Sequence, residues 1–462
     1  VSKGGTISGE HGIGIEKQEF MPLMYSEEEL SAMYELKGIF DPKELLNPGK
    51  VFPKAEALLV CTPPLEGAKP LDLVGPMVEP DTVEAASYVL CGLSAAGKSI
   101  RIRGGGTKST LFAPADVTLS SAGLAGVQTY ARDDLYVKVG AGTRLSDLQA
   151  ELAEDGMWVP MLSPWPEATA GGIVAGGFNA PLRMRYGGVR DLVLAMTTIL
   201  PDGRIIRAGR PVMKNVAGFD LTKLFIGSHG TLGFITDVTF KLSPKPRLAK
   251  TLAVPVPTMA DGLAWGPRFL QEALVASAVT LCDGRSIPGV DSDLVLLYTA
   301  EGLPEDVTAE LRNVRALAGE FGIAKPVSLD LSGSQAWATW MAAPVVGTER
   351  LVRVGVAPKE LAELVQASGP LTEGCAAVVD FAHGQLFLRG DLDLDGVRRQ
   401  AVSRGGYAVL LRTGAEPGAP ADAPQIGVVD IWGYAPQGLD LAQAIKRQWD
   451  PDGRLNPGTF II

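Results

Sequence analysis

The sequence is poor in cysteine, histidine and positive charge. Its 462 residues include four cysteines, three histidines and a formal net charge of −10. The cysteines, Cys61, Cys91, Cys282 and Cys375, are isolated, so they give no sign of a zinc knuckle, an iron–sulfur run or a disulfide framework and indicate a reducing compartment. The negative charge argues against nucleic acid or an anionic lipid surface as the main partner.

Long apolar runs are also missing. No run approaches the roughly 18 residues that a membrane-spanning helix needs, and residues 1–5 read V-S-K-G-G rather than a basic stretch followed by an apolar one. We therefore expect neither a secretory signal nor a membrane span. The expected location is the cytoplasm, with any membrane association arising through partner subunits.

Glycine, by contrast, is abundant and clustered. Of the 55 glycines, many lie between Pro164 and Pro244, in T-A-G-G-I-V-A-G-G, R-Y-G-G-V-R-D, N-V-A-G-F-D-L and G-S-H-G-T-L-G-F-I-T. Closely spaced glycines let a backbone approach a flat ligand and offer N–H groups to phosphates. One such cluster is more often an ordinary tight turn, but four within about eighty residues favour a cofactor cleft.

A further glycine run, R-G-G-G-T-K-S at positions 103–109, follows a predicted strand from Ser99 to Arg103. Consecutive glycine N–H groups can form a concave anion nest, to which Thr107 or Ser109 adds a hydroxyl. Alone, a triple glycine after a strand is more often a plain turn. Together with the later clusters it favours phosphate binding.

Residues 92–99, G-L-S-A-A-G-K-S, match the phosphate loop of nucleoside triphosphatases. That loop must follow a strand and open a helix. Here a helix predicted from Asp81–Thr82 to about Ala96 precedes the motif and a strand follows it. We therefore expect no ATP hydrolysis.

The order and spacing of these clusters resemble the FAD-binding domain of the vanillyl-alcohol oxidase type and, more narrowly, the E-type subunits of bacterial glycolate oxidases. The resemblance runs from Val74 to Ile462 and is most specific between Arg101 and Pro244. It implies an α+β fold in which a ferredoxin-like (split βαβ) cap covers the flavin. Two series of strand, helix, strand pair and helix between Leu252 and Arg412 fit such a cap.

A nine-residue frame occurs twice. D-P-K-E-L-L-N-P-G at 41–49 and D-P-D-G-R-L-N-P-G at 450–458 share D-P-x-x-x-L-N-P-G, and a lysine and an aromatic residue precede each copy. In the family this frame closes the polypeptide, so residues 1–53 resemble the C-terminal tail of the D-type subunit. The alternative is a coincidental helix stop, because Asn-Pro-Gly commonly ends helices. The expected divisions are a tail at 1–53, a linker at 54–73, the FAD-binding domain at 74–246, the cap at 247–415 and a return segment at 416–462.

The resemblance also assigns FAD contacts, to the phosphates, to the flavin side and to the adenosine side. The matched residues are Arg103, Gly104, Gly105, Gly106, Thr107, Lys108, Ser109, Thr169, Gly171, Gly172, Ala175, Gly230, Gly233, Ile235 and Asn456. No histidine lies in the first loop and no cysteine lies near a glycine cluster. We therefore expect FAD to be held without a covalent bond.

The three histidines are the natural candidates for a base near neutral pH. His11 with Glu10, in S-G-E-H-G-I-G, resembles the substrate-side motif of the D-type subunit, so both are candidate catalytic residues. The family's other histidine ligands have no counterpart in this sequence, so no metal is expected. His229 and His383 are expected to be structural.

The resemblance implies the FAD-binding subunit of a glycolate (2-hydroxy acid) dehydrogenase or oxidase complex. Its partners would be a D-type FAD subunit and an iron–sulfur subunit that receives the electrons. Two alternatives stay open: a self-sufficient FAD-dependent oxidoreductase acting on another hydroxy acid or alcohol, and a structural partner whose flavin does no chemistry. We expect the isolated chain to bind FAD but to oxidise glycolate or D-lactate negligibly, and residues 1–53 to be dispensable for flavin binding.

Overall fold

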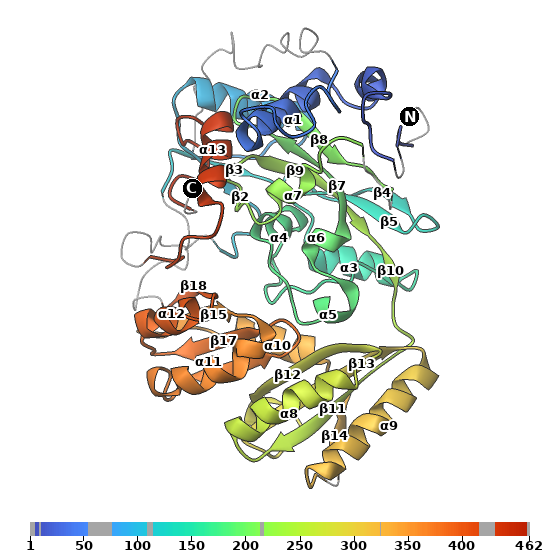
Figure 1. The fold of residues 1–462 in the computed structure, drawn as a ribbon, viewed down its shortest axis with the longest axis vertical. Coiled ribbons are helices and arrows are strands. Elements are labelled where there is room, and N and C mark those ends of the chain that lie inside the picture. Colours follow the sequence, from blue (N-terminus) through green and yellow to red (C-terminus); the bar gives the residue numbers. More distant parts are fainter. Residues whose placement is uncertain are drawn as a thin grey trace.

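The computed structural model describes residues 5–8, 11–53, 76–108, 114–212, 217–323, 325–414 and 430–459. Two bodies are stacked along the long axis, with both ends of the chain in the upper one (Figure 1). The expected linker, Glu10 and Ser109 lie outside the described residues.

Among the described residues, the upper body contains three sheets. A parallel sheet has the order β1-β3-β2 and an antiparallel sheet has the order β4-β5-β9-β7-β8. Their bounds are β1 (Met77–Val78), β2 (Ile100–Arg103), β3 (Val117–Ser120), β4 (Val127–Ala131), β5 (Tyr136–Gly140), β7 (Val193–Ile199), β8 (Ile205–Gly209) and β9 (Phe234–Lys241). A third pair joins β6 (Met157–Trp158) to β10 (Ser243–Pro244). The helices are α2 (Val83–Ala95), α3 (Leu145–Ala153), α4 (Ala170–Gly176), α5 (Arg183–Tyr186), α6 (Val189–Leu192) and α7 (Thr222–Phe225).

Local sequence explains the first of these elements. The Thr82 side chain accepts a hydrogen bond from the N–H of Ala85 and so caps α2. Gly97, with φ of +71°, turns the chain after the helix toward β2. The G-x-x-x-x-G-K-S motif therefore lies at the end of a helix and before a strand, the reverse of what a triphosphate-binding loop requires.

The lower body is built on one antiparallel sheet with the strand order β14-β11-β13-β12-β16-β17-β15-β18. Its strands are β11 (Leu248–Val256), β12 (Ala276–Asp283), β13 (Leu294–Gly302), β14 (Val327–Leu329), β15 (Arg350–Gly355), β16 (Ala376–Asp380), β17 (Gln385–Gly390) and β18 (Tyr407–Thr413). The helices are α8 (Met259–Gln271), α9 (Pro304–Glu320), α10 (Gly333–Ala342), α11 (Leu361–Ser368) and α12 (Leu394–Val402). Each half of the sheet has the order fourth, first, third, second strand, which is the split βαβ arrangement expected for the cap.

The two faces of the cap sheet belong to different cores. Leu296 and Val352 face a core shared with α8, α9, α11 and α12. Leu297 and Phe387 face the other way and join α10 and the flavin domain in one continuous core. The lower body is therefore packed onto the upper body through buried apolar surface.

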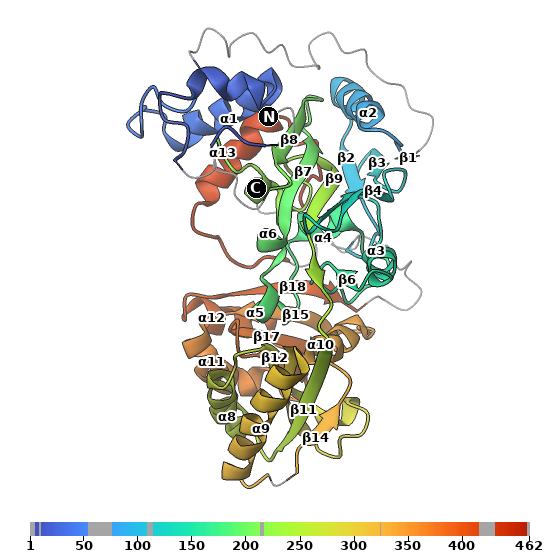
Figure 2. The same ribbon diagram turned by 90° about the vertical axis from the view of Figure 1, so that its right-hand side faces the viewer.

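The N-terminal segment is folded as part of the upper body. Its helix α1 (Glu27–Phe40) begins with a capping box formed by Ser26 and Glu29, and it lies beside α13 (Leu439–Trp449) (Figure 2). None of the helices in the described ranges is long and apolar enough to cross a membrane.

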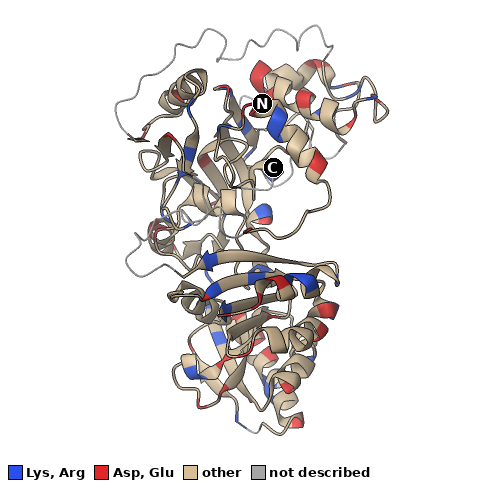
Figure 3. Ribbon diagram, turned by 90° about the vertical axis from the view of Figure 1, so that its left-hand side faces the viewer, with Lys and Arg blue, Asp and Glu red and all other residues tan. Residues whose placement is uncertain are grey.

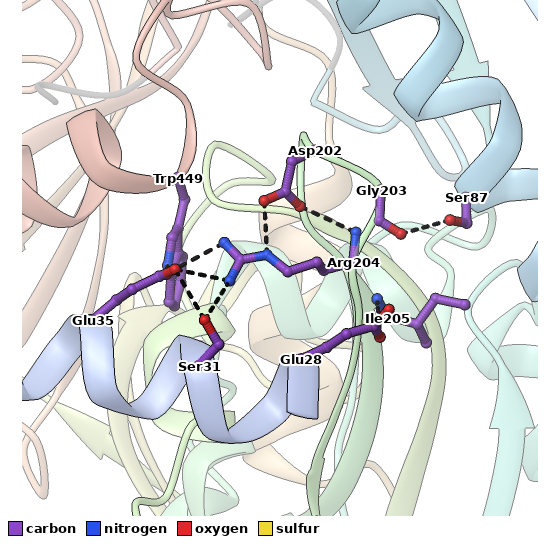
Figure 4. A network of polar contacts seen from close by, with 9 residues as sticks. All are labelled: Glu28, Ser31, Glu35, Ser87, Asp202, Gly203, Arg204, Ile205 and Trp449. Atoms are coloured by element: carbon purple, nitrogen blue, oxygen red, sulfur yellow. Dashed lines mark hydrogen bonds and ion pairs between the residues drawn. The ribbon is translucent and has the colours of Figure 1, made fainter. Parts of the chain in front are cut away.

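A buried arginine ties α1 to the flavin domain (Figure 4). Arg204, in the turn before β8, places NH1 2.8 Å from Glu35 Oε1 and Nε 2.7 Å from Asp202 Oδ2. The indole N–H of Trp449 donates to Glu35 Oε2 at 2.8 Å. Glu35 thus joins α1, the β7–β8 turn and α13.

We expect Glu35→Gln to lower stability by about 1–3 kcal/mol, because Arg204 would keep only Asp202 as a charged partner. FAD content should not change, since Glu35 does not line the cavity described below. Denaturant midpoints and flavin absorbance measure the two effects, and Glu27→Gln, an exposed change on the same helix, is the control. A large loss of FAD in Glu35→Gln would contradict this expectation and would show that the N-terminal segment shapes the flavin site.

Candidate flavin site

One cavity of about 1020 Å³, part of it open to solvent, lies in the upper body. Its walls come from β2 and the loop after it, from α4, from the loop before β9 and from the return segment. Of the residues matched to FAD contacts, all that the structure describes line it: Arg103, Gly104, Gly105, Gly106, Thr107, Lys108, Thr169, Gly171, Gly172, Ala175, Gly230, Gly233, Ile235 and Asn456. The structure thus brings together segments from four separate parts of the chain.

In the loop after β2, glycine is required mainly because a side chain would clash with neighbouring protein atoms. A Cβ at Gly105 would lie 1.6 Å from the carbonyl oxygen of Glu167, and one at Gly104 would lie 2.4 Å from Thr169 Oγ1. Gly106 adopts φ of +71°. At Gly104 and Gly105 a side chain would therefore clash with the segment before α4, and the anion nest expected from residues 103–109 stays a prediction.

Helix α4 presents its backbone to the cavity at Gly172. The Thr169 hydroxyl accepts from the N–H of Gly172 at 3.3 Å and caps the helix. A Cβ at Gly172 would meet only Thr169 Oγ1, at 3.2 Å, whereas one at Gly171 would lie 2.7 Å from Ala141 Cβ. Gly172 is therefore a position where a side chain would enter the cavity itself.

Asn456 holds two walls together. Its Oδ1 accepts from the N–H of Ile102 at 2.7 Å, and its Nδ2 donates to the carbonyl of His229 at 2.8 Å. A Cβ at Gly230 would lie 2.6 Å from Asn456 Nδ2, and Gly230 has φ of +70°. The Asn of the repeated frame thus fixes the first loop relative to the loop before β9.

A group of cations lies where the cavity meets the cap. Lys108 Nζ is 4.8 Å from the centre of the Trp165 ring and 5.6 Å from that of Phe178. From the cap, the guanidinium carbons of Arg412 and Arg353 lie 5.3 Å and 5.7 Å from the same two rings, respectively. In Figure 3, Lys and Arg are seen on the cap strands nearest the flavin domain, whereas Asp and Glu follow mostly the outer helices.

These cations lack acidic partners. Within the described ranges, none of Lys108, Arg353 and Arg412 forms an ion pair with a carboxylate, and the buried Nε of Arg353 has no hydrogen-bond partner there. A second, smaller cavity beside the first is lined by Lys108, His229 and Arg353. Clustered, half-buried cations without counter-charges among the described residues favour an anionic ligand at this junction.

Two residues that line the cavity have strongly lowered pKa values. Burial, with help from the nearby Arg353 and Arg412 charges, lowers the pKa of Lys108 to about 8. Burial, followed by the charges of Lys108 and Arg353, lowers the pKa of His229 to about 3. The imidazole of His229 is therefore neutral at physiological pH, and Lys108 is mostly charged.

The proposed catalytic histidine lies elsewhere. His11 is exposed in the N-terminal segment and lines neither cavity. His383 lies in the β16–β17 turn, where its Nδ1 is 2.8 Å from Asp380 Oδ2, in keeping with the structural role expected for it. His229, also expected to be structural, lines both cavities and packs its ring against Trp432.

Sequence reasoning missed the residues that the cap contributes. Arg353 lies between the buried Val352 and Val354 on β15, and Arg412 lies near the end of β18. A charged residue flanked by buried valines in a predicted strand was the available signal. Its position beside the cavity depends on how the cap packs, which no local pattern reveals.

The cavity suits a flavin dinucleotide. The described lining residues include the cations Arg101, Arg103 and Lys108 and hydroxyls such as that of Thr107, but no carboxylate. This donor set matches a pyrophosphate, and glycine-lined walls admit flat rings. Among the described residues, no group of three or more His, Cys, Asp and Glu side chains could hold a metal ion.

Comparison with known proteins identifies the family. Residues 76–209 match the model of an FAD binding domain, and residues 1–51 and 433–460 both match the model of the C-terminal domain of FAD linked oxidases. Glycolate oxidase subunit GlcE of Escherichia coli is 30% identical over 72% of this chain and 84% of its own length. The chain belongs to the FAD-linked oxidases. FAD is its cofactor, and the expectation of an FAD-dependent oxidoreductase is confirmed.

Other relatives of this FAD-linked oxidase share parts of it. A D-lactate dehydrogenase of Anaerostipes hadrus is 36% identical over 32% of each chain, so the match spans about a third of that protein. Glycolate oxidase subunit GlcD of Bacillus subtilis is 25% identical over 71% of this chain and 76% of its own length. The solved structure of p-cresol methylhydroxylase has a TM-score of 0.64 at 16% identity and covers 94% of this chain. The expected α+β, vanillyl-alcohol oxidase type fold is thereby confirmed, whereas the non-covalent attachment of FAD stays a prediction.

Proposed function

We propose that this FAD-linked oxidase is the FAD-binding subunit of a glycolate (2-hydroxy acid) dehydrogenase complex. Its partners would be a D-type FAD subunit and an iron–sulfur subunit that receives the electrons. The similarity to GlcE over 84% of that subunit's length supports the choice of complex. The observation that carries the proposal is the group of three cations, Lys108, Arg353 and Arg412, beside the flavin cavity.

A 2-hydroxy acid needs a cation for its carboxylate and a base for its hydroxyl proton. Lys108, Arg353 and Arg412 would hold the carboxylate, and the rings of Trp165 and Phe178 would keep water from the space between them. FAD, when bound through the first loop, α4 and Asn456, supplies the acceptor for the hydride. The chain therefore provides anion binding, orientation and the electron acceptor.

Of these groups, the base is the one for which the chain offers the weakest candidates. The imidazole of His229, with a pKa near 3, takes up a proton poorly at neutral pH. His11, the base expected from the sequence, lies in the N-terminal segment outside both cavities. We accordingly assign substrate turnover to the assembled complex and not to this chain alone.

One observation favours the self-sufficient alternative. A lysine with a pKa of about 8, as for Lys108, is partly neutral near that pH and can accept a proton. If Lys108 were the base, the isolated chain would oxidise a hydroxy acid without partners. The two functions therefore differ in what the chain does alone.

The test is dye-linked oxidation of glycolate and of D-lactate by the purified chain, with and without D-type and iron–sulfur subunits. We expect the isolated chain to be slower by at least about a hundredfold, the usual contribution of a positioned base. Appreciable turnover by the chain alone that Lys108→Met abolishes would favour the self-sufficient enzyme. A flavin in this chain that substrate fails to reduce even within the complex would make the chain a structural holder.

A further inference from the structure

The two copies of the repeated frame have the same backbone conformation. Asp41 ends α1 with φ −142° and ψ 64°, and Asp450 ends α13 with φ −139° and ψ 68°. Three further pairs of equivalent residues all have positive φ, which is rare outside glycine. The pairs are Glu44 (51°) and Gly453 (62°), Asn47 (49°) and Asn456 (45°), and Gly49 (65°) and Gly458 (68°).

The hydrogen bonds inside the two copies also correspond. In the first, the Asp41 carboxylate accepts from the N–H groups of Leu45 and Leu46, both at 2.8 Å, and from Lys37 Nζ. In the second, the Asp450 carboxylate accepts from the N–H groups of Arg454 and Leu455, at 3.0 and 2.9 Å, and from Lys446 Nζ. The lysine donates in turn to the carbonyl of Leu46 or Leu455. We call residues 41–50 the N-terminal clip and residues 450–459 the C-terminal clip.

The C-terminal clip shows what such a structure does. Leu455, fully buried, forms a parallel bridge with Ile100 of β2, and the N–H of Asn456 donates to the carbonyl of Ile100 at 2.8 Å. Asn456 then joins β2 to the loop before β9, as described above. Trp449, just before the clip, stacks on Phe225. The clip thus closes the edge of β2 and completes a wall of the flavin cavity.

The N-terminal clip has the same structure, but none of the described strands lies beneath it. Leu46, the equivalent of Leu455, is 63% exposed, Phe40, the equivalent of Trp449, is 52% exposed, and Leu45 is 74% exposed. In the described part of the chain, we find no hydrogen bond from residues 41–50 to any residue beyond 53. The residues equivalent to those that hold the C-terminal clip on β2 are therefore exposed to solvent in the N-terminal clip.

The clip is nevertheless held firmly. Helix α1 buries Leu30, Met33 and Leu36 and is fixed to Arg204 through Glu35. An ion pair between Lys37 in α1 and Asp41, the first residue of the clip, connects the clip to this helix. A pre-ordered apolar loop with exposed leucines costs little entropy to dock, which favours a binding role.

We infer that the N-terminal clip docks on a second FAD-binding domain of this fold, one that lacks a closing segment of its own. Leu46 would lie against the strand equivalent to β2, and Asn47 would join that strand to the loop equivalent to the one before β9. A second copy of this chain does not fit, because Leu455 and Asn456 already fill its β2 edge. The inference rests on the proposed function only for the choice of partner, the D-type subunit.

The experiment uses two forms of a D-type glycolate oxidase subunit, complete and shortened by its own closing segment, each co-expressed with this full-length chain. We expect the chain to co-purify with the shortened form and to raise its FAD content, and to bind the complete form at least about tenfold more weakly, since that edge is already covered. Leu46→Asp and Asn47→Gly, the second of which tolerates the positive φ of this position, should weaken binding of the shortened form by a similar factor. Leu274→Asp, at an 86% exposed position in the cap, is the matched control.

The clip variants change exposed side chains, so their own FAD content and thermal midpoint should equal those of the unmodified chain, which excludes misfolding. Unchanged binding in Leu46→Asp, or equal binding of the two D-type forms, would overturn the inference. A photo-cross-linker at Leu46 gives an independent result: linkage to the flavin domain of the D-type subunit supports docking, and linkage only within this chain refutes it. If the clip docks but the complex does not oxidise glycolate, the result counts against the proposed function alone. If the complex oxidises glycolate equally well with and without the clip substitutions, the result counts against this inference alone.

Discussion

Gly105→Val should purify with less than roughly a tenth of the normal FAD content. The new side chain would begin with a Cβ only 1.6 Å from the carbonyl oxygen of Glu167, so the first loop or the segment before α4 must shift. Overpacking of this kind costs about 1–3 kcal/mol, which equals a factor of roughly 5 to 150 in affinity if it falls on the bound state. The ratio of flavin to protein absorbance measures the loss.

Two further valine variants separate the possible causes. Gly172→Val adds a Cβ that meets only Thr169 Oγ1 among protein atoms within 4 Å, so we expect FAD to be lost while the apoprotein keeps its thermal midpoint. In Gly105→Val the apoprotein midpoint should fall as well. Gly319→Val, at a cap position with no atom within 4 Å of the added Cβ, should change neither quantity. A Gly105→Val protein that stays yellow at full occupancy would remove the first loop from the flavin site.

Anion binding at the cation group should weaken steeply above pH 8. Lys108, with a pKa of about 8, carries its charge below that pH and loses it as the pH rises. Oxalate, a dicarboxylate without an oxidisable hydroxyl, is a suitable probe, and its dissociation constant should rise by up to about tenfold for each pH unit once a single lysine controls binding. The shift of the flavin absorbance bands on titration with oxalate measures the constant.

The matching variants decide whether Lys108 is responsible. Lys108→Met should bind oxalate more weakly at pH 7 and should show no pH dependence between 7 and about 9. Lys359→Met removes a lysine whose side chain is 83% exposed, far from any role in the cavity, and should keep the unmodified profile. If oxalate affinity were flat with pH in the unmodified chain, Arg353 and Arg412 alone would hold the anion.

The fold was predictable where local chemistry decides it. The cap at Thr82 places α2 within a residue of expectation, and strand and helix periodicity predicted most elements of the cap. The sequence interpretation missed α10 and β14, a ten-residue helix and a three-residue strand. Such elements depend on the sheet that they join and not on their own pattern.

The candidate site was predictable in part for the same reason. Glycine runs in sequence marked the walls of the cavity, but not why each glycine is required. Gly105 is required because a side chain would clash with Glu167, about sixty positions away, and Gly230 because a side chain would clash with Asn456. Arg353 lines the smaller cavity and Arg412 lies over the Trp165 ring because β15 and β18 are neighbours at one edge of the cap sheet. Contacts between distant segments follow from packing, which a single sequence does not display.

The seam between the two halves of the cap sheet has a mechanical consequence. Strands β12 and β16 are joined by three residue pairs, Thr280 with Asp380, Leu281 with Val379 and Cys282 with Val378, whereas β11 and β13 share nine. The pair β11–β14 at the edge of the sheet is equally short, with three residue pairs. Because Arg353 and Arg412 both belong to the half beyond the seam, any rotation of that half about the seam would carry both cations together relative to Lys108.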